Sequence, residues 1–513
     1  MNRHDTILIL DFGSQYTQLI ARALRSLNVY CEIHPFNLAA DKIHELAPKA
    51  VILSGSPFSL LDPDPPRPDA LVWELDLPLL GICYGQQLIA DHFGGQIERH
   101  TSREYGRAVL DLPLPHPLFT GISSGAQVWM SHGDSVSKLP EGFQVLASTA
   151  SVPYAAIAHK NRPIFALQFH PEVVHTPEGK TILANFALQI AGCSADWTPE
   201  NFIASSVKAI RAQTGCAKVV LGLSGGVDSS VAALLLHKAI GSRLIPIFVD
   251  NGCMRFQEAQ RVKEAFSAVP GIGIDIVDAS RLFLQRLAGV EDPEQKRRVI
   301  GHTFIEVFET EAAKHDGVEF LAQGTLYPDV IESVSFRGPS ATIKSHHNVG
   351  GLPDKMGLKL IEPFRELFKD EVRAVGRELG LPETLISRHP FPGPGLAVRI
   401  IGAVDAERIA CLQAIDEIFI SELRDWGLYD STWQAFAVLL PIRSVGVMGD
   451  ERTYENVCAL RAVNSVDGMT ADWTEFPPAF LKHVSSRVIN EVRGVNRVVY
   501  DISSKPPATI EWE

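Results

Sequence analysis

Lys218-Val-Val-Leu-Gly-Leu-Ser-Gly-Gly-Val-Asp-Ser-Ser230 is the stretch of sequence that decides the fold of the middle of the chain. Its apolar run Lys218–Leu223 predicts a buried strand, and a helical pattern follows from about Ser229 to Ile240. A second apolar run, Arg243–Val249, predicts the next strand. A strand, a glycine-rich turn, a helix and a further strand are typical of the opening of a nucleotide-binding βαβ unit in a parallel α/β sheet.

The turn between this strand and this helix has the chemistry of a phosphate-binding site. It contains Ser224, Gly225, Gly226, Val227, Asp228, Ser229 and Ser230. Backbone N–H groups at a helix N-terminus bind anions, and the serine hydroxyls add further donors. Asp228 would repel a phosphate directly, so we expect it to act through Mg²⁺. The turn matches neither a P-loop nor the G-x-G-x-x-G of dinucleotide folds, so γ-phosphate transfer and hydride transfer are both unsupported.

This turn resembles the Ser-Gly-Gly-x-Asp-Ser signature of the ATP pyrophosphatases. The resemblance implies that its residues bind ATP, which these enzymes split between the α and β phosphates while they place AMP on an oxygen of the substrate. We also expect Asp250, at the end of the next strand, to lie near the adenosine end of the nucleotide.

The first part of the chain, from residue 6 to about residue 190, alternates short apolar runs with amphipathic stretches. Buried strands are predicted at Thr6–Leu10, Val29–Ile33, Ala50–Leu53 and Leu77–Ile82, and helical patterns begin near Gln15 and Gly85. This alternation predicts another α/β layer with a mostly parallel sheet. From about Gly125 to Gln168 we expect shorter strands, with turns at His132-Gly133-Asp134 and at Lys160-Asn161.

A cysteine stands between one of these strands and its helix, in Gly81-Ile82-Cys83-Tyr84-Gly85. This is the cysteine counterpart of the Gly-x-Ser-x-Gly elbow, in which the glycines permit a sharp turn that exposes the nucleophile. The N-terminus of the following helix favours a reactive thiolate. The backbone N–H groups of Tyr84 and of Gly55, which follows another strand in Ser54-Gly55-Ser56-Pro57, are candidate donors to an oxyanion.

A base and an acid for this nucleophile follow in Phe165-Ala-Leu-Gln-Phe-His170-Pro171-Glu172. Such a nucleophile requires a base that an acid orients, and both groups come just after a predicted strand. Together these residues resemble a class I (triad) glutamine amidotransferase, which releases ammonia from the glutamine side chain. The resemblance implies that Cys83 is the nucleophile, His170 the general base and acid, and Glu172 the group that orients His170. The family more often has a second glycine where this chain has Ser56.

An ammonia source and an adenylating ATP site in one chain imply that a carbonyl oxygen is adenylated and that ammonia then displaces AMP. From about residue 5 to its C-terminus the chain resembles the glutamine-hydrolysing GMP synthase family, and the matching stretches include 293–304, 321–329, 343–351, 388–395 and 505–512. The resemblance implies that xanthosine 5′-monophosphate (XMP) is adenylated at its C2 oxygen and aminated to GMP. It also implies XMP contacts from Arg297, Lys505 and Glu511.

Composition excludes several classes of protein. The 513 residues carry 47 Lys+Arg against 60 Asp+Glu, a net charge of −13, which argues against a protein that coats nucleic acid. No apolar run is long enough for a signal peptide or a membrane span, so we expect a soluble, cytoplasmic protein without a membrane partner. The seven cysteines are scattered and include no CxxC pair, so we expect neither a disulfide framework nor a structural zinc.

Mg²⁺ bound with ATP is the cofactor that we expect, and no redox cofactor is expected. The pair His346-His347 has no cysteine or third histidine at ligand spacing, so we interpret it as part of a glycine-rich loop over the ATP site. In this loop Lys344 is a candidate contact to a phosphate.

The expected architecture is α/β with three domains. Residues 5–195 are predicted to form a flavodoxin-like class I amidotransferase domain and residues 196–389 a Rossmann-like ATP pyrophosphatase domain. Residues 390–513 are predicted to form a smaller α+β domain, and the resemblance implies that it contacts XMP and forms a homodimer. The small-molecule substrates are then glutamine, ATP and XMP. Two alternatives stay open: an NAD synthetase-like reaction on deamido-NAD, and a nucleotide-binding regulatory protein that has lost catalysis.

Overall fold

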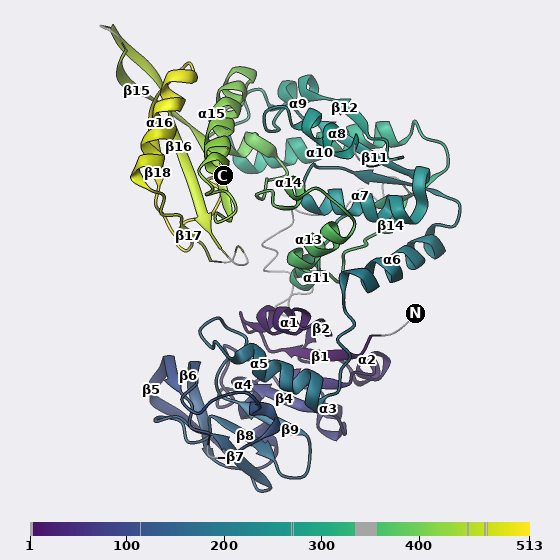
Figure 1. Ribbon diagram of the computed structural model, residues 1–513, viewed down its shortest axis with the longest axis vertical. Coiled ribbons are helices and arrows are strands. Elements are labelled where there is room, and N and C mark those ends of the chain that lie inside the picture. Colours follow the sequence, from purple (N-terminus) through teal and green to yellow (C-terminus); the bar gives the residue numbers. More distant parts are fainter. Residues whose placement is uncertain are drawn as a thin grey trace. The chain divides into compact units, whose positions relative to one another are not determined.

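The computed structural model describes residues 4–112, 114–267, 269, 271–333, 357–448, 451–465, 468 and 470–513 (Figure 1). Contacts divide the chain into two compact units: of the described residues, 4–205 and 331–333 belong to the first, and 206–330 and 357–513 belong to the second. Helix α6 (Pro199–Thr214) contains the point of division. The three domain boundaries expected from the sequence stay predictions.

The first unit is built on a seven-stranded sheet in the order β2-β1-β3-β4-β9-β8-β7. Its strands are β1 (Thr6–Asp11), β2 (Tyr30–Pro35), β3 (Ala50–Leu53), β4 (Leu79–Ile82), β7 (Phe143–Ala147), β8 (Ala156–His159) and β9 (Ile164–Leu167). Strands β2, β1, β3, β4 and β9 pair in parallel, whereas β8 pairs antiparallel with β9 and β7. The five parallel strands have the flavodoxin order, which confirms the predicted fold class for this unit.

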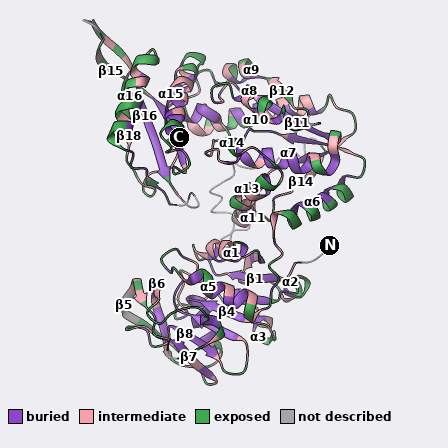
Figure 2. Cartoon of the chain, in the orientation of Figure 1, coloured by how far each residue is buried: buried purple, intermediate pink, exposed green. Residues whose placement is uncertain are grey.

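Helices of the first unit connect these strands. They are α1 (Thr17–Arg25), α2 (Ala40–Leu46), α3 (Leu71–Glu74), α4 (Tyr84–His92) and α5 (Gly179–Ala184), and α5 continues into a π-helical turn, Asn185–Ile190. Strands β3, β4 and β9 are buried along their whole length, as parallel strands covered on both faces must be. Figure 2 shows this buried centre in purple.

A separate two-stranded ribbon corrects one prediction. Strands β5 (Gln96–Val109) and β6 (Gln127–Lys138) pair antiparallel, and His132-Gly133-Asp134 lies inside β6 rather than in a turn. The reason is the period of two along β6: Val128, Met130, His132 and Asp134 are all buried, so the alternation outweighs the turn propensity of glycine. The turn predicted at Lys160-Asn161 is confirmed, since it joins the antiparallel strands β8 and β9.

The second unit begins with a five-stranded parallel sheet in the order β12-β11-β10-β13-β14. Its strands are β10 (Lys218–Gly222), β11 (Leu244–Asp250), β12 (Asp275–Asp278), β13 (Val318–Ala322) and β14 (Lys359–Ile361). Its helices after α6 are α7 (Val227–Ile240), α8 (Glu258–Ser267), α9 (Ser280–Leu287), α10 (Pro293–Ala312), α11 (Tyr327–Ser333), α13 (Lys369–Glu378) and α14 (Glu383–Ile386). The sheet extends in one direction from β10 to β11 and in the other to β13, so a crevice for a ligand is expected at the carboxyl ends of β10 and β13.

An α+β layer completes the second unit, coloured light green to yellow in Figure 1. Its elements are the 3₁₀ turn Gly395–Arg399, α15 (Ala406–Asp425), β15 (Gln434–Met448), β16 (Glu451–Asn464), β17 (Asp472–Trp473), α16 (Pro478–Glu491) and β18 (Val495–Asp501). Strand β16 pairs antiparallel with β15 and β17 and parallel with β18. The helix predicted at Asp405–Trp426 is α15 with its two capping residues.

One hydrophobic cluster runs through both parts of the second unit. It joins Val249 of β11 and Phe283 of α9 to Leu396 of the 3₁₀ turn, Leu412 of α15 and Leu439 of β15. Because this core is continuous, the α+β layer and the parallel sheet form a single compact unit. Within the described part of the chain, none of the helices combines the length and the apolar character that crossing a membrane requires.

Three buried cations hold the last residues of the chain. The side chains of Lys296, Arg399 and Arg461 are fully buried and pair with Glu513, Glu511 and Asp501 respectively. Arg461 also donates to the backbone oxygens of Ser503, Thr509 and Ile510. An unpaired charge in this position would be strongly destabilising, so each cation requires its carboxylate.

Candidate functional site

The predicted nucleophile lies at a strained turn between β4 and α4. Cys83 has φ +54° and ψ −103°, a backbone conformation that is rare for a residue with a side chain. A Cβ on Gly81 would lie 2.4 Å from the backbone of Gly85, and a Cβ on Gly85 would lie 2.4 Å from the Leu53 carbonyl oxygen. Both glycines of the elbow are therefore sterically required, and they allow α4 to begin at the residue that follows Cys83.

His170 and Glu172 form a buried pair beside this cysteine. His170 Nδ1 lies 2.7 Å from Glu172 Oε1, and the two side chains are only 4% and 1% exposed. Burial acts to lower the pKa of His170, but the charge of Glu172 and a hydrogen bond with the Cys83 side chain outweigh it and raise this pKa well above 6.5. The Glu172 carboxylate thus favours the protonated form of the imidazole, which hydrogen-bonds with the Cys83 side chain.

Three further residues border Cys83 or His170, and the sequence did not point to them as site residues. Cys83 Sγ lies 3.7 Å from the Ser131 carbonyl oxygen and 3.8 Å from Gln168 Nε2. The ring of Tyr16 meets the His170 ring edge-on, with 5.0 Å between their centroids. Gln168 stands two residues before His170 on the same strand end, which was a usable signal, whereas nothing in the sequence marks Tyr16 or Ser131.

The structure also brings both oxyanion candidates to the nucleophile's edge of the sheet. A Cβ on Gly55 would lie 3.2 Å from His170 Cε1, so a larger residue here would have to displace the imidazole slightly. Ser56, in the position where the family more often has glycine, donates its hydroxyl to the Phe12 carbonyl oxygen at 2.8 Å and thereby ties the loop to the end of β1. Tyr84 is the first residue of α4, where backbone N–H groups have no carbonyl within the helix. Their role as oxyanion donors stays a prediction.

The second candidate site is the turn between β10 and α7, at the crevice expected from the strand order. Gly225 has φ +77°, and the Ser229 hydroxyl accepts from Ser224 N at 3.2 Å. The carbonyl oxygen of Gly226 accepts from the hydroxyls of Ser229 and Ser230, at 3.2 and 2.8 Å. This carbonyl is therefore turned into the helix, and the backbone N–H groups at the start of α7 remain as the donors that suit a phosphate.

Asp228 lies at the start of α7, beside two cations that the sequence analysis missed. Its Oδ2 atom is 3.8 Å from Lys369 Nζ, and its buried Oδ1 atom has no hydrogen-bond partner among the described residues. Burial raises the pKa of this carboxyl, although the charges of Lys369 and Arg373 act to lower it. Both cations come from α13, more than 100 residues further along the sequence, so no local pattern reveals them. Asp250 lies at the end of β11 and accepts from Gly252 N at 2.9 Å.

The three predicted XMP contacts are engaged in contacts within the fold. Arg297 donates to Glu294 Oε1 at 2.6 Å and to the backbone oxygen of Glu513 at 2.7 Å. Glu511 accepts two hydrogen bonds from Arg399, at 2.8 and 3.1 Å. Lys505 donates to the Gly468 carbonyl oxygen at 2.8 Å. Arg297 and Glu511 thus belong to one network around residues 511–513, and the XMP role of all three stays a prediction.

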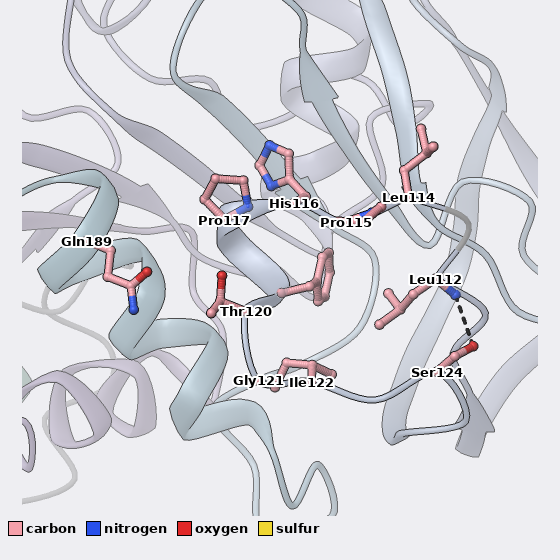
Figure 3. Close-up of a pocket in the computed structure, with 11 residues that line it drawn as sticks. Leu112, Leu114, Pro115, His116, Pro117, Thr120, Gly121, Ile122, Ser124 and Gln189 are labelled. Carbon is pink, nitrogen blue, oxygen red and sulfur yellow. Dashed lines mark hydrogen bonds between the residues drawn. The ribbon is translucent and has the colours of Figure 1, made fainter.

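Other predicted features lie away from these groups or outside the described residues. Lys344, His346 and His347 are outside the described residues. In the parts that are described, no group of three or more His, Cys, Asp or Glu side chains is arranged to hold a metal ion. A pocket of about 700 Å³ in the first unit is lined by apolar residues such as Leu112, Phe119 and Ile122, with Gln189 at its side, and by none of the predicted site residues (Figure 3).

Comparison with known proteins accounts for both sites in one chain. The family model for class-I glutamine amidotransferase matches residues 8–190, that for NAD synthase matches residues 199–292, and that for the GMP synthase C terminal domain matches residues 421–512. The glutamine-hydrolyzing GMP synthase of Sinorhizobium fredii is 58% identical over 99% of both chains. Those of Brachyspira hyodysenteriae and Phenylobacterium zucineum are 57% identical over 100% and 58% identical over 99% of both chains. The chain belongs to the glutamine-hydrolysing GMP synthase family.

Proposed function

We propose that this chain is a glutamine-dependent GMP synthase with one reaction site in each unit. The observation that carries this proposal is the presence, in one chain, of a buried Cys83–His170–Glu172 group on one parallel sheet and a Ser-Gly-Gly-Val-Asp-Ser turn on another. The NAD synthase model matches only residues 199–292, whereas the likeness to GMP synthases covers the whole chain, which favours XMP over deamido-NAD as the acceptor.

The first site releases ammonia from glutamine. His170 accepts the proton of the Cys83 thiol, Sγ attacks the side-chain amide carbon, and the oxyanion that forms accepts hydrogen bonds from the N–H groups of Gly55 and Tyr84. The protonated His170 gives its proton to the departing nitrogen, and a thioester remains. Water, deprotonated by His170, then cleaves the thioester to glutamate. Glu172 holds the imidazole in place throughout, and its charge stabilises the imidazolium that forms when His170 takes up a proton.

The second site forms the C–N bond. The C2 oxygen of XMP attacks the α-phosphorus of ATP, and pyrophosphate departs. The turn from Ser224 to Ser230 binds the phosphates, and Lys369 and Arg373 add positive charge beside it. Ammonia then attacks C2, AMP departs with the oxygen, and GMP results.

The acceptor is tested by product analysis. Incubation with ATP, glutamine and XMP should yield GMP, AMP, pyrophosphate and glutamate in equal amounts, whereas deamido-NAD in place of XMP should yield no NAD. Amination of deamido-NAD but not of XMP would refute the proposed acceptor. If no pyrophosphate is released with either acceptor, even when ammonium salt replaces glutamine, the chain is a regulatory protein that has lost catalysis.

Cys83→Ala should separate the activities of the two sites. We expect glutamine-dependent GMP formation to fall by at least about 10³-fold, because a removed nucleophile leaves only the residual effect of binding. GMP formation from ammonium chloride should stay within about twofold of the unchanged protein, since the second site needs only ammonia. A folded C83A protein that has lost both activities would contradict this division of labour.

Mg²⁺ is the cofactor that we propose for the second site. Asp228 fits it, because one oxygen of its carboxylate is buried and has no hydrogen-bond partner among the residues that the structure describes. Mg²⁺ commonly takes one or two carboxylates together with substrate phosphates. The ion supplies positive charge against the polyphosphate. Asp228→Asn should lower pyrophosphate release by about 10²-fold or more with either nitrogen source. If D228N keeps the activity and the Mg²⁺ dependence of the unchanged protein, Asp228 is not the residue that holds the ion.

We further propose that the protein acts in the cytoplasm as a homodimer formed through β15 and β16. All seven cysteines are free thiols, which suits a reducing compartment. Ile442, Val445, Val447 and Tyr454 expose apolar side chains on these two strands, and a second copy of the chain would bury them.

Negative charges introduced on β15 should separate the two copies of the proposed dimer. Val447 is 74% exposed, and Val447→Asp combined with Val445→Asp should shift the mass in light scattering from dimer to monomer. Val174→Asp is the matched control, since Val174 is 82% exposed on the first unit and should leave the mass unchanged. A monomeric unchanged protein would refute the proposed dimer.

A further inference from the structure

The candidate phosphate turn is held from behind by one arginine. Arg388 lies just after α14, in the segment that leads from the parallel sheet to the α+β layer. Its Nη1 atom donates to the Gly225 carbonyl oxygen at 2.8 Å, and its Nη2 atom donates to Glu258 Oε2 at 2.6 Å. The Arg388 and Glu258 side chains are 14% and 6% exposed, so the pair is largely shielded from water.

This contact orients the peptide between Gly225 and Gly226. In a trans peptide the carbonyl oxygen and the next N–H point in opposite directions. With the Gly225 oxygen bound to Arg388, the Gly226 N–H is directed to the other side, where its present partner is Ser224 Oγ at 3.3 Å. Because the Gly226 oxygen is also turned away into α7, neither carbonyl dipole faces an incoming phosphate.

Arg388 also neutralises a carboxylate that lies directly behind the turn. A Cβ on Gly225 would be 2.8 Å from Glu258 Oε1, which shows how closely this acid approaches the backbone. Without Arg388 the Glu258 charge would be buried, unpaired and adjacent to a site that has to accept a polyanion. Glu258 in turn fixes the second nitrogen of the guanidinium.

The backbone of Arg388 is itself anchored by its neighbour. His389 N donates to Tyr429 Oη at 3.0 Å, Ala435 N donates to His389 Nδ1 at 3.2 Å, and the His389 and Tyr429 rings stack with 3.8 Å between centroids. With Nδ1 as acceptor, Nε2 carries the hydrogen toward the Tyr429 carbonyl oxygen at 3.0 Å. Burial lowers the pKa of His389 to about 4, so this ring stays neutral. The α+β layer thus fixes the backbone position from which the Arg388 side chain extends.

We infer that Arg388 is a positioning residue for the phosphate turn: it fixes the Gly225–Gly226 peptide and cancels the Glu258 charge, so that the turn is pre-formed for the polyphosphate of ATP. The inference rests on the proposed ATP site and assigns this residue no direct contact with a substrate.

Arg388→Gln tests the inference through pyrophosphate release with saturating ammonium chloride, which bypasses Cys83. The KM for ATP should rise about tenfold or more, because a charge-assisted hydrogen bond in a buried position is lost, while the KM for XMP should change by less than about twofold. Glu258→Gln should raise the ATP KM by less than about threefold, since Arg388 keeps its bond to Gly225. Arg377→Gln is the matched control: Arg377 makes a similar forked pair with Glu383, but both side chains are more than half exposed and the pair lies off the turn.

The double variant Arg388→Gln with Glu258→Gln separates positioning from mere stability. It removes the unpaired acid, so its unfolding temperature should recover toward that of the unchanged protein, whereas its KM for ATP should stay high because the Gly225 carbonyl still lacks its donor. Joint recovery of both quantities, or an unchanged ATP KM in R388Q, would overturn the inference. If R388Q does not fold, Arg388→Lys takes its place in the test. One ammonium group cannot bond fully to both the Gly225 carbonyl oxygen and Glu258, so the KM for ATP should rise above that of the unchanged protein by less than about tenfold.

Titration of ATP by calorimetry keeps this inference distinct from the proposed function. Absence of pyrophosphate release from ATP and XMP in the unchanged protein would refute the proposed function alone. Equal ATP affinity in the unchanged protein and R388Q would refute the role of Arg388 alone.

Discussion

Both candidate reaction sites depend on one constraint, the sharp turn by which a parallel strand enters its helix at the carboxyl edge of a sheet. At β4 this turn forces Cys83 into a positive φ and permits no side chain on Gly81 or Gly85. At β10 it places Gly225 at φ +77° and brings the first N–H groups of α7 to the carboxyl edge of the sheet. The same local geometry therefore supports two chemistries: in the first the turn exposes one sulfur atom, and in the second it exposes a set of donors.

The two turns differ in how they are held. The elbow is fixed by close packing, since its glycines contact the backbone of β3 and of the elbow itself. The phosphate turn is fixed by hydrogen bonds and charge, from Ser229 and Ser230 within the turn and from Arg388 behind it. This difference is physically reasonable, because a nucleophile has to be placed to within a fraction of an ångström, whereas an anion is attracted over a longer range.

The sequence was sufficient where the fold depends on local patterns. Runs such as Ala50–Leu53 are apolar because both faces of the strand are covered, and they predicted β1, β3, β4, β10 and β11 to within two residues. It failed at His132-Gly133-Asp134, where cross-strand pairing with β5 overrode the turn propensity of glycine. It also failed for Lys369, Arg373 and Arg388, since a charged residue resembles any solvated surface residue until the fold brings it to its partner. Arg297 and Lys505, which resemble family positions, turn out to be engaged within the chain itself.

The neutral His389 ring links the unfolding of the second unit to the uptake of a proton. An unfolded chain would bind a proton at this ring near pH 6.5, whereas the folded chain resists it down to about pH 4. The contribution of this ring to stability is therefore complete above pH 6.5 and diminishes as the pH falls toward 4. Because His389 bonds to Tyr429 and Ala435 of the α+β layer, protonation of this ring would weaken the contact between that layer and the segment that carries Arg388.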